Sequence, residues 1–344
     1  MTIRIGLVGC GNVSAKYLAT VGGAAGVEVV ACADRDAERA LAIEADFGIQ
    51  ALASVDELLA LPEVDLVLNL TAPRAHAEVS LAAIAAGKHV YSEKPLATTL
   101  EDGVRVVEAA DRAEVRVGCA PDSFLGDGLQ AMAKLIADRA IGRPLSAISI
   151  LATTGPEHFH PAPEFLYLEG AGPLFDIGPY LVTALTFLLG PARAVTATTA
   201  TPVDMRTLRV GGRAGDTFLT AVPTFISSIL EFESGAVATL LQGWDVVGTT
   251  APRLEIHGTA GSIAGPSPDS WGGPLRLMRA GDDSFSEVMP TGSAGSRLGI
   301  GVLQMAAALE AGEAPAASGE RGLHTLAILQ AILHSAKSGQ RLCL

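Results

Sequence analysis

Positive charge is scarce in this chain. Its 344 residues contain 24 Lys and Arg against 37 Asp and Glu, which gives a formal net charge of -13, and the basic residues form no long run. A polyanion is bound chiefly by clusters of Lys and Arg, so the deficit disfavours nucleic acid as a partner.

Cysteine and long apolar stretches are scarce as well. The four cysteines, Cys10, Cys32, Cys119 and Cys343, are widely separated and lack CxxC or Cys/His ligand spacing, so we expect reduced residues of the core. No segment offers about 18 uninterrupted apolar residues, and the first residues lack the long apolar region of a signal peptide. We therefore expect a cytoplasmic protein with no membrane partner.

Apolar residues nevertheless make up 49% of the chain, which is ample material for buried cores. A length of 344 residues exceeds that of a usual domain. We predict two domains, residues 1–121 and 122–344, with no internal repeat or long linker.

The first 121 residues alternate apolar strand candidates with helical stretches. The candidates are residues 3–8, 27–33, 66–70, 89–92 and 115–120. This alternation predicts a parallel sheet, and continuous apolar strands such as 65–70 predict helices over both of its faces. The first domain is therefore expected to be a doubly wound α/β domain.

The pattern changes after residue 121. Helices are predicted at 128–139 and 174–189, and strands at 146–152, 196–201, 226–233, 236–244 and 253–257. The last four strands are separated by short Gly or Pro breaks without helices, which predicts an α+β domain with an antiparallel sheet. Residues 265–295 are expected to form loops and hairpins, and a last helix, about 323–338, is expected to pack back on the first domain.

A glycine-rich turn follows the first strand. Gly9 permits a tight bend, and Gly11 permits close approach of a pyrophosphate to the following helix N-terminus, where free amides and the helix dipole favour anions. Asn12 and Val13 continue this turn, and Ser14 stands where a third glycine is usual. A plain strand-to-helix turn is the alternative, but the position directly after the first strand favours dinucleotide binding.

Asp34 ends the second strand candidate, about 25 residues after Gly9. A carboxylate there accepts hydrogen bonds from the adenosine ribose hydroxyls and repels a ribose phosphate, which favours NAD over NADP. Neighbouring Arg35 leaves NADP possible. A solvated carboxylate or a helix N-cap is the alternative for Asp34.

Taken in order, the motifs resemble the family of glucose-fructose oxidoreductase, inositol dehydrogenase and rhizopine-catabolism proteins, abbreviated Gfo/Idh/MocA. The resemblance covers nearly the whole chain and rests on Gly9-Cys10-Gly11-Asn12, the strand with Asp34, Thr71-Ala72-Pro73-Arg74-Ala75-His76, Gly87-Lys88-His89-Val90, Glu93-Lys94-Pro95 and Gly172-Pro173-Leu174-Phe175-Asp176-Ile177-Gly178-Pro179-Tyr180. It implies an N-terminal Rossmann domain, a C-terminal domain with an open sheet, and hydride transfer between nicotinamide and a sugar, cyclitol or related alcohol. It also implies homodimers or homotetramers through that sheet.

Lys94 follows the strand candidate at 89–92. Pro95 pushes the backbone of Lys94 toward extended geometry, which presents the lysine at a strand end facing the nicotinamide crevice. There a lysine can donate a hydrogen bond to the substrate oxygen, provided that its pKa falls from about 10.4. The resemblance implies that Lys94 is catalytic, and Glu93 is expected to orient the site or the nicotinamide ribose. A lysine on a surface loop is the alternative.

Three further residues are expected beside the cofactor. Thr71, Pro73 and His76 follow the strand at 66–70, at the carboxyl end where open α/β sheets bind ligands. His76 equally fits a structural role at the start of a helix.

Asp176 and Tyr180 are four residues apart at the start of a predicted helix, so we expect their side chains on one face. Many relatives carry histidine at the place of Tyr180, whereas some branches use a tyrosine beside a lysine as the acid/base. We therefore expect Tyr180 to be the acid/base, Lys94 its electrostatic partner and Asp176 the acceptor of a substrate hydroxyl. A core tyrosine with a satisfied hydroxyl is the alternative.

The segment 155–161 contains His158 and His160, which are both candidates for contact with substrate hydroxyls and cannot be ranked from sequence. Phe165 and Tyr167 are candidate walls of the pocket. Two histidines one residue apart can ligate zinc, but no third ligand follows at suitable spacing, so we expect no metal. A basic cluster, residues 206–213, fits an anion clamp, a subunit contact or a solvated loop.

The sequence thus predicts an NAD(P)-dependent oxidoreductase that acts on a CH–OH group of a small sugar or polyol. Two other functions stay open. One is glycoside cleavage or epimerisation by a transient redox cycle, and the other is a non-catalytic NAD and sugar sensor. The presence of both Lys94 and Tyr180 argues against the sensor.

Overall fold

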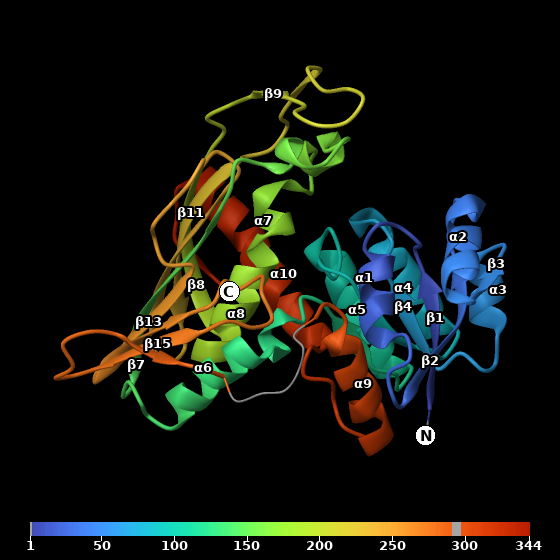
Figure 1. Ribbon diagram of the computed structural model, residues 1–344, viewed down its shortest axis with the longest axis horizontal. Coiled ribbons are helices and arrows are strands. Elements are labelled where there is room, and N and C mark those ends of the chain that lie inside the picture. The colour runs from blue at the N-terminus through green and yellow to red at the C-terminus, as the bar shows by residue number, and fades with distance from the viewer. Residues whose placement is uncertain (1, 291–296) are drawn as a thin grey trace. The chain divides into compact units, whose positions relative to one another are not determined.

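The fold is described by a computed structural model, which covers residues 2–290 and 297–344 (Figure 1). Contacts divide the chain into two compact units. The first unit comprises residues 1–122 and 297–326, and the second comprises residues 123–296 and 327–344.

The first unit contains a parallel six-stranded sheet in the order β3-β2-β1-β4-β5-β6. Its strands are β1 (Ile3–Val8), β2 (Val27–Ala33), β3 (Gln50–Leu52), β4 (Leu66–Asn69), β5 (His89–Ser92) and β6 (Val117–Cys119). Strand order reverses between β1 and β4, so their carboxyl ends form the switch point at which such sheets bind ligands. The predicted doubly wound fold is confirmed.

Helices cover this sheet because its strands are apolar on both sides. The helices are α1 (Ser14–Val21), α2 (Ala37–Phe47), α3 (Val55–Ala60), α4 (His76–Ala85) and α5 (Leu100–Arg112). Every residue of β4 is buried. Helix α4 contacts both α3 and α5, whereas α1 contacts α9 (Ile300–Ala311).

Residues 297–326 complete the first unit, although the predicted ranges put them in the second domain. The Oδ2 atom of Asp122 accepts hydrogen bonds from the amides of Gly299 and Gly301, at 2.8 and 3.0 Å. The amide of Cys119 donates to the carbonyl of Ala317 at 2.8 Å. Helix α10 (Gly319–Ser338) begins in this unit and ends in the second.

The second unit contains a nine-stranded sheet in the order β16-β15-β14-β13-β7-β12-β11-β8-β17. Its strands are β7 (Pro144–Ala152), β8 (Ala192–Ala200), β11 (Phe225–Phe232), β12 (Val237–Gly243), β13 (Leu254–Gly258), β14 (Gly261–Gly265), β15 (Leu275–Arg279), β16 (Ser286–Val288) and β17 (Leu342–Cys343). Only β7 and β12 pair in parallel among these described strands. The predicted, mostly antiparallel sheet is confirmed.

Helix α6 (Asp127–Ala137) contacts α8 (Gly178–Leu189), which in turn contacts β7 and β12 of this sheet. Burial alternates along β11, as expected for a sheet with one covered face. On the other face Ile229 is 45% and Val237 41% exposed. A separate pair, β9 (Met205–Thr207) and β10 (Thr217–Leu219), forms between β8 and β11.

Two local expectations were wrong. The predicted helix 174–189 is two helices, α7 (Gly172–Asp176) and α8, with a break at Ile177. A Cβ on Gly178 would lie 2.8 Å from Gln242 Oε1 and 2.9 Å from a Leu329 methyl, so these two side chains pack closely against the glycine at the break. Cys343 is exposed, unlike the other three cysteines, because it lies on the short edge strand β17.

Among the described residues, no helix is long and apolar enough to cross a membrane.

Candidate active site

The glycine-rich turn leaves β1 at the switch point of the parallel sheet. Gly9 has φ of 97°, and a Cβ there would lie 2.6 Å from the carbonyl of Leu70, which follows the neighbouring strand β4. A side chain is therefore impossible at Gly9 without moving β4. At Gly11, by contrast, a Cβ would meet only Arg39 Nη1, at 3.9 Å, so the backbone is open to a ligand.

The helix that follows this turn has an N-terminus suited to an anion. Val13 gives helix α1 no side-chain cap, and its first turn contains no acidic residue. Ser14 Oγ donates to the carbonyl of Gly11 at 2.6 Å, so this hydroxyl does not cap the amides of the helix N-terminus. The Cys32 thiol and burial raise the pKa of Cys10, so this thiol stays neutral and adds no repulsion. Together these groups fit a pyrophosphate.

Asp34 is oriented by two backbone amides. Its Oδ2 accepts from Cys10 N at 2.8 Å and its Oδ1 from Asp36 N at 2.9 Å. The carboxylate is half-buried, whereas Arg35 is exposed. Because each oxygen keeps a further lone pair, Asp34 can still accept from ribose hydroxyls. The turn and Asp34 together fit NAD.

The loop after β5 is fixed through Glu93. One carboxylate oxygen accepts from the Tyr17 hydroxyl at 2.7 Å and the other from the amide of Lys94 at 2.9 Å. Burial, followed by the charge of Glu93, raises the pKa of Tyr17, so the phenol stays a donor. The amide of Glu93 donates to the carbonyl of Asn69 at 2.9 Å. Glu93 thus orients the backbone of Lys94.

The three residues expected after β4 lie in different environments. Thr71 is half-buried, and both its amide and its hydroxyl donate to Asn69 Oδ1. Pro73 is exposed. His76 is only 1% exposed, and its ring nitrogens face the carbonyls of Pro95 and Thr71.

In the second unit, Asp176 and Tyr180 lie on opposite sides of the helix break. Asp176 ends α7, and Tyr180 lies in the first turn of α8, where its amide donates to the carbonyl of Ile177 at 3.2 Å. Both side chains are half-buried. The helix is therefore interrupted at Ile177 between the two residues, and both lie close to that break.

The structure separates the two histidines that the sequence could not rank. His158 is exposed and lines a pocket of about 250 Å³, together with Thr154, Arg209 and Trp244. His160 accepts from Ala162 N at 3.0 Å through Nδ1. Its ring also packs edge-on against Phe165, which is 54% exposed. His158 therefore lines a pocket, whereas the ring of His160 is engaged with Ala162 and Phe165.

A buried charge network beneath this pocket was missed by the sequence analysis. Arg206 is 4% exposed and donates to Glu157 Oε1 at 3.2 Å and to Asp245 Oδ1 at 2.5 Å. Tyr167 donates to the second oxygen of Glu157 through a short hydrogen bond, and Thr224 donates to the second oxygen of Asp245 at 2.6 Å. Sequence alone showed Arg206 only as part of a basic cluster, because its partners come from segments far along the chain.

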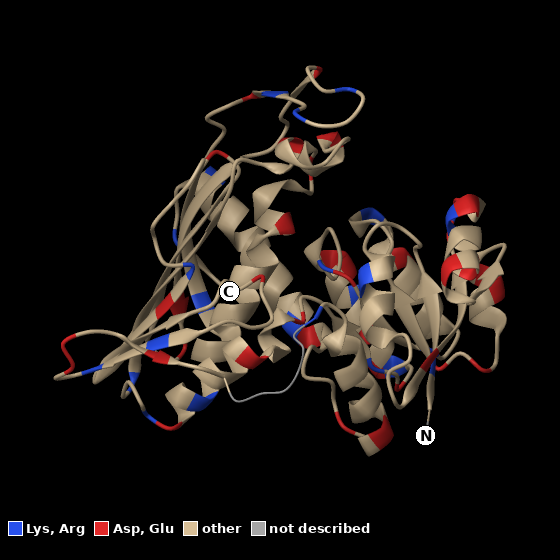
Figure 2. Cartoon of the chain, in the orientation of Figure 1, with Lys and Arg blue, Asp and Glu red and all other residues tan. Residues whose placement is uncertain are grey.

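The network joins three segments of the second unit. Glu157 lies in the turn Pro156–His158, Arg206 in β9 and Asp245 just after β12. The β9–β10 segment carries both basic and acidic residues (Figure 2). Of its three arginines, Arg206 is buried in the network, whereas Arg209 and Arg213 are exposed.

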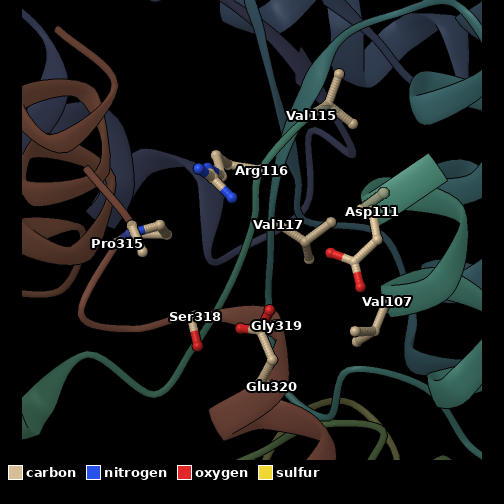
Figure 3. Close-up of a pocket in the computed structure, with 11 residues that line it drawn as sticks. Val107, Asp111, Val115, Arg116, Val117, Pro315, Ser318, Gly319 and Glu320 are labelled. Carbon is tan, nitrogen blue, oxygen red and sulfur yellow. The ribbon is translucent and has the colours of Figure 1, made fainter. Parts of the chain in front are cut away.

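A smaller pocket in the first unit lies beside β6 (Figure 3). Val107 and Asp111 border it from α5, and Pro315, Ser318 and Glu320 border it from the opposite segment. Its volume of about 30 Å³ suits a single water. It adjoins the amino end of β6, away from the carboxyl-end loops, so it is not the cofactor site.

Within residues 2–290 and 297–344, no group of three or more His, Cys, Asp or Glu side chains is arranged to hold a metal ion.

Comparisons with known proteins extend these observations. Residues 3–120 match a family model described as an oxidoreductase family with an NAD-binding Rossmann fold. Residues 129–264 match the GFO/IDH/MocA C-terminal domain.

The similarity to curated relatives spans almost the whole chain. A 1,5-anhydro-D-fructose reductase of Ensifer adhaerens is 32% identical over 348 residues, covering 98% of this chain and 97% of the relative. An inositol 2-dehydrogenase of Rhizobium meliloti is 26% identical over 341 residues, covering 97% of each.

Solved structures share the fold. Levoglucosan dehydrogenase, in complex with NADH and levoglucosan, has a TM-score of 0.85 at 23% identity, covering 100% of this chain and 99% of that one. Aldose-aldose oxidoreductase of Caulobacter crescentus has a TM-score of 0.84 at 22% identity, covering 100% of both chains.

Proposed function

This chain belongs to the Gfo/Idh/MocA family of NAD-binding oxidoreductases, and on that premise we propose that it interconverts a secondary alcohol and a carbonyl on a sugar or cyclitol. The observation that carries the proposal is the convergence of the Gly9 turn, Asp34 and the Lys94 loop at the carboxyl edge of one parallel sheet. Bound NAD supplies the hydride acceptor for this chemistry.

We assign three residues to the reacting carbon. Tyr180 is the acid/base that holds the proton of the substrate hydroxyl, and Lys94 is its electrostatic partner. Asp176 accepts a hydrogen bond from a substrate hydroxyl. The half-burial of Asp176 and Tyr180 supports this assignment, because each side chain is partly shielded from water and yet accessible.

The proposed cofactor preference is NAD, with NADP as a weaker alternative. The two amides that orient Asp34 support the preference, because they hold a negative carboxylate where a ribose phosphate would approach. Asn12, Val13, Thr71 and Pro73 are proposed to border the cofactor. Arg35 is exposed beside Asp34 and is the residue through which NADP would be tolerated.

The proposed substrate class comes from the relatives named above and from the pocket beside His158. This pocket, of about 250 Å³, is lined by polar groups of Thr154, Thr207 and Arg209 and not by Asp176 or Tyr180, so it is proposed as a subsite apart from the reacting carbon. Phe165 and His160 are proposed as more distant walls.

The roles of the two domains, the oligomeric state and the cellular location are also proposals. Residues 1–121 bind the dinucleotide, and residues 122–344 bind substrate and mediate assembly. The exposed face of the nine-stranded sheet, with Ile229 and Val237, supports a homodimer or homotetramer through that sheet. We propose a cytoplasmic location, where reduced cysteines and NAD are both maintained.

The test is to mix the purified protein with NAD, and separately with NADP, against aldoses, inositols, 1,5-anhydro sugars and aryl diols while following reduced-nicotinamide absorbance. Turnover with NAD and a sugar or cyclitol supports the proposal. A Lys94→Ala variant should retain NAD binding and lose about 10²- to 10⁴-fold in turnover. Measurable NAD binding with no turnover on any substrate would contradict it.

A further inference from the structure

His76 connects two loops at the carboxyl edge of the parallel sheet. It begins α4 and is 1% exposed. Its Nδ1 lies 2.6 Å from the carbonyl of Pro95, and its Nε2 lies 2.9 Å from the carbonyl of Thr71. Thr71 follows β4 and Pro95 follows β5, and these strands pair side by side. One buried ring therefore bridges the ends of adjacent strands.

Lys94 lies between two anchored peptide groups. On its N-terminal side, its own amide donates to Glu93 Oε2 at 2.9 Å. On its C-terminal side, the carbonyl of Pro95 faces His76. Glu93 is itself held by Tyr17 of α1. The lysine side chain therefore starts from a backbone that is fixed at both flanks.

Only one of the two carbonyl contacts can be a hydrogen bond while the ring is neutral. A carbonyl oxygen accepts but does not donate, and a neutral imidazole has one N–H. Burial is the largest influence and lowers the pKa of His76, whereas the carbonyls of Pro95 and Thr71 and the charge of Glu93 raise it and the charge of Lys94 lowers it. We assign the N–H to Nδ1, because its contact with Pro95 is the shorter.

We propose that His76 is a positioning residue for Lys94, acting by donating a hydrogen bond to the carbonyl of Pro95, the residue that follows the lysine. This inference rests on the catalytic role proposed above for Lys94 and gives His76 a role that acts through the backbone beside the lysine. A lysine displaced by about 1 Å would lose much of its effect on the reaction.

Two variants separate the ring's contacts. His76→Asn places an amide nitrogen near the position of Nδ1, whereas His76→Gln places one near that of Nε2. Both are compared at a temperature where circular dichroism shows each to be folded. We expect His76→Asn to retain kcat within about threefold and His76→Gln to lose about 10- to 100-fold in kcat, with NAD affinity unchanged in both. Equal kcat in the two variants would overturn the proposal.

A second readout does not depend on turnover. The lysines of this chain are Lys16, Lys88, Lys94, Lys134 and Lys337, so reductive ¹³C-methylation gives a small set of NMR signals, assigned for Lys94 with Lys94→Arg. We expect the Lys94 signal and its pH titration to match wild type in His76→Asn and to shift in His76→Gln. An unshifted signal in His76→Gln overturns the positioning role. A shifted signal in a protein that turns over no sugar or cyclitol supports the positioning role and counts only against the proposed function.

Discussion

The two units hold their functional loops by different means. In the first unit, the loops leave adjacent buried strands, and backbone amides hold them by donating to the carboxylates of Asp34 and Glu93. Where two loops approach most closely, at Gly9, only glycine fits. In the second unit, the loop segments are tied by the buried charges of Glu157, Arg206 and Asp245. The first unit is therefore vulnerable to added atoms, whereas the second is vulnerable to a lost charge.

The largest effect is expected from removing the central charge of the second unit. Arg206→Met leaves Glu157 and Asp245 buried without their cation, so we expect a loss of about 3–5 kcal/mol in the free energy of unfolding. Urea unfolding monitored by the fluorescence of Trp244 and Trp271 measures it. Arg213→Met is the control, since Arg213 is an exposed arginine of the same segment and should leave unfolding unchanged. An equal free energy of unfolding in the two variants would show that the buried charge of Arg206 does not stabilise the second unit.

The next effect tests the intolerance of the first unit to added atoms. Gly9→Ala introduces a Cβ 2.6 Å from the carbonyl of Leu70 at a φ of 97°. We expect a cost of about 1–3 kcal/mol and at least a tenfold loss of NAD affinity by calorimetry. Gly23→Ala is the control, because Gly23 also has positive φ, 76°, but has nothing within 4 Å of a Cβ. Equal NAD affinity in the two variants would show that the close approach to Leu70 does not matter.

A smaller effect is expected at Asp34. Asp34→Ala removes the acceptor for two amides and for the ribose, so NAD affinity should fall by about 1–2 kcal/mol, roughly 5- to 30-fold, while NADP affinity falls less. The ratio of the two dissociation constants is the measurement. Asp36→Ala removes the N-cap of α2, and it should reduce stability without altering that ratio. An unchanged ratio in Asp34→Ala would refute the role of this carboxylate in cofactor choice.

The smallest effect concerns the two histidines of the second unit. His158→Gln should raise KM about three- to tenfold, about 1 kcal/mol, with little change in kcat, because His158 lines the pocket. His160→Gln should leave KM unchanged, since that ring is engaged with Ala162 and Phe165. Steady-state kinetics on a turned-over substrate decides between them, and the reverse pattern would place the substrate beside His160.

Sequence reasoning succeeded where structure is local and repetitive. The alternation of strands and helices in residues 1–121 predicted the parallel sheet, because each apolar strand must be buried by the helix that follows it. The Gly9 turn and Asp34 could be identified for the same reason, since their positions at strand ends follow from the strands themselves.

It failed where a contact joins distant segments. The partners of Arg206 lie 49 and 39 residues away, and no local pattern marks them. Helix α9 is apolar on several sides and was not predicted. The elements that cover it, α1 and β6, come from the beginning of the chain, far from its own sequence. Gln242 and Leu329, which pack against Gly178 at the break between Asp176 and Tyr180, also lie far along the chain. The roles assigned to Lys94, Asp176 and Tyr180 stay predictions.

The return of residues 297–326 to the first unit sets an order of events during synthesis. Asp122 emerges from the ribosome long before Gly299 and Gly301, whose amides it accepts from. At translation rates of about 5–20 residues per second, the intervening segment takes roughly ten seconds or more to appear. The nascent N-terminal sheet therefore lacks α9 while residues 123–296 of the second unit are being made, and a fragment ending at residue 122 would remain in that unfinished state.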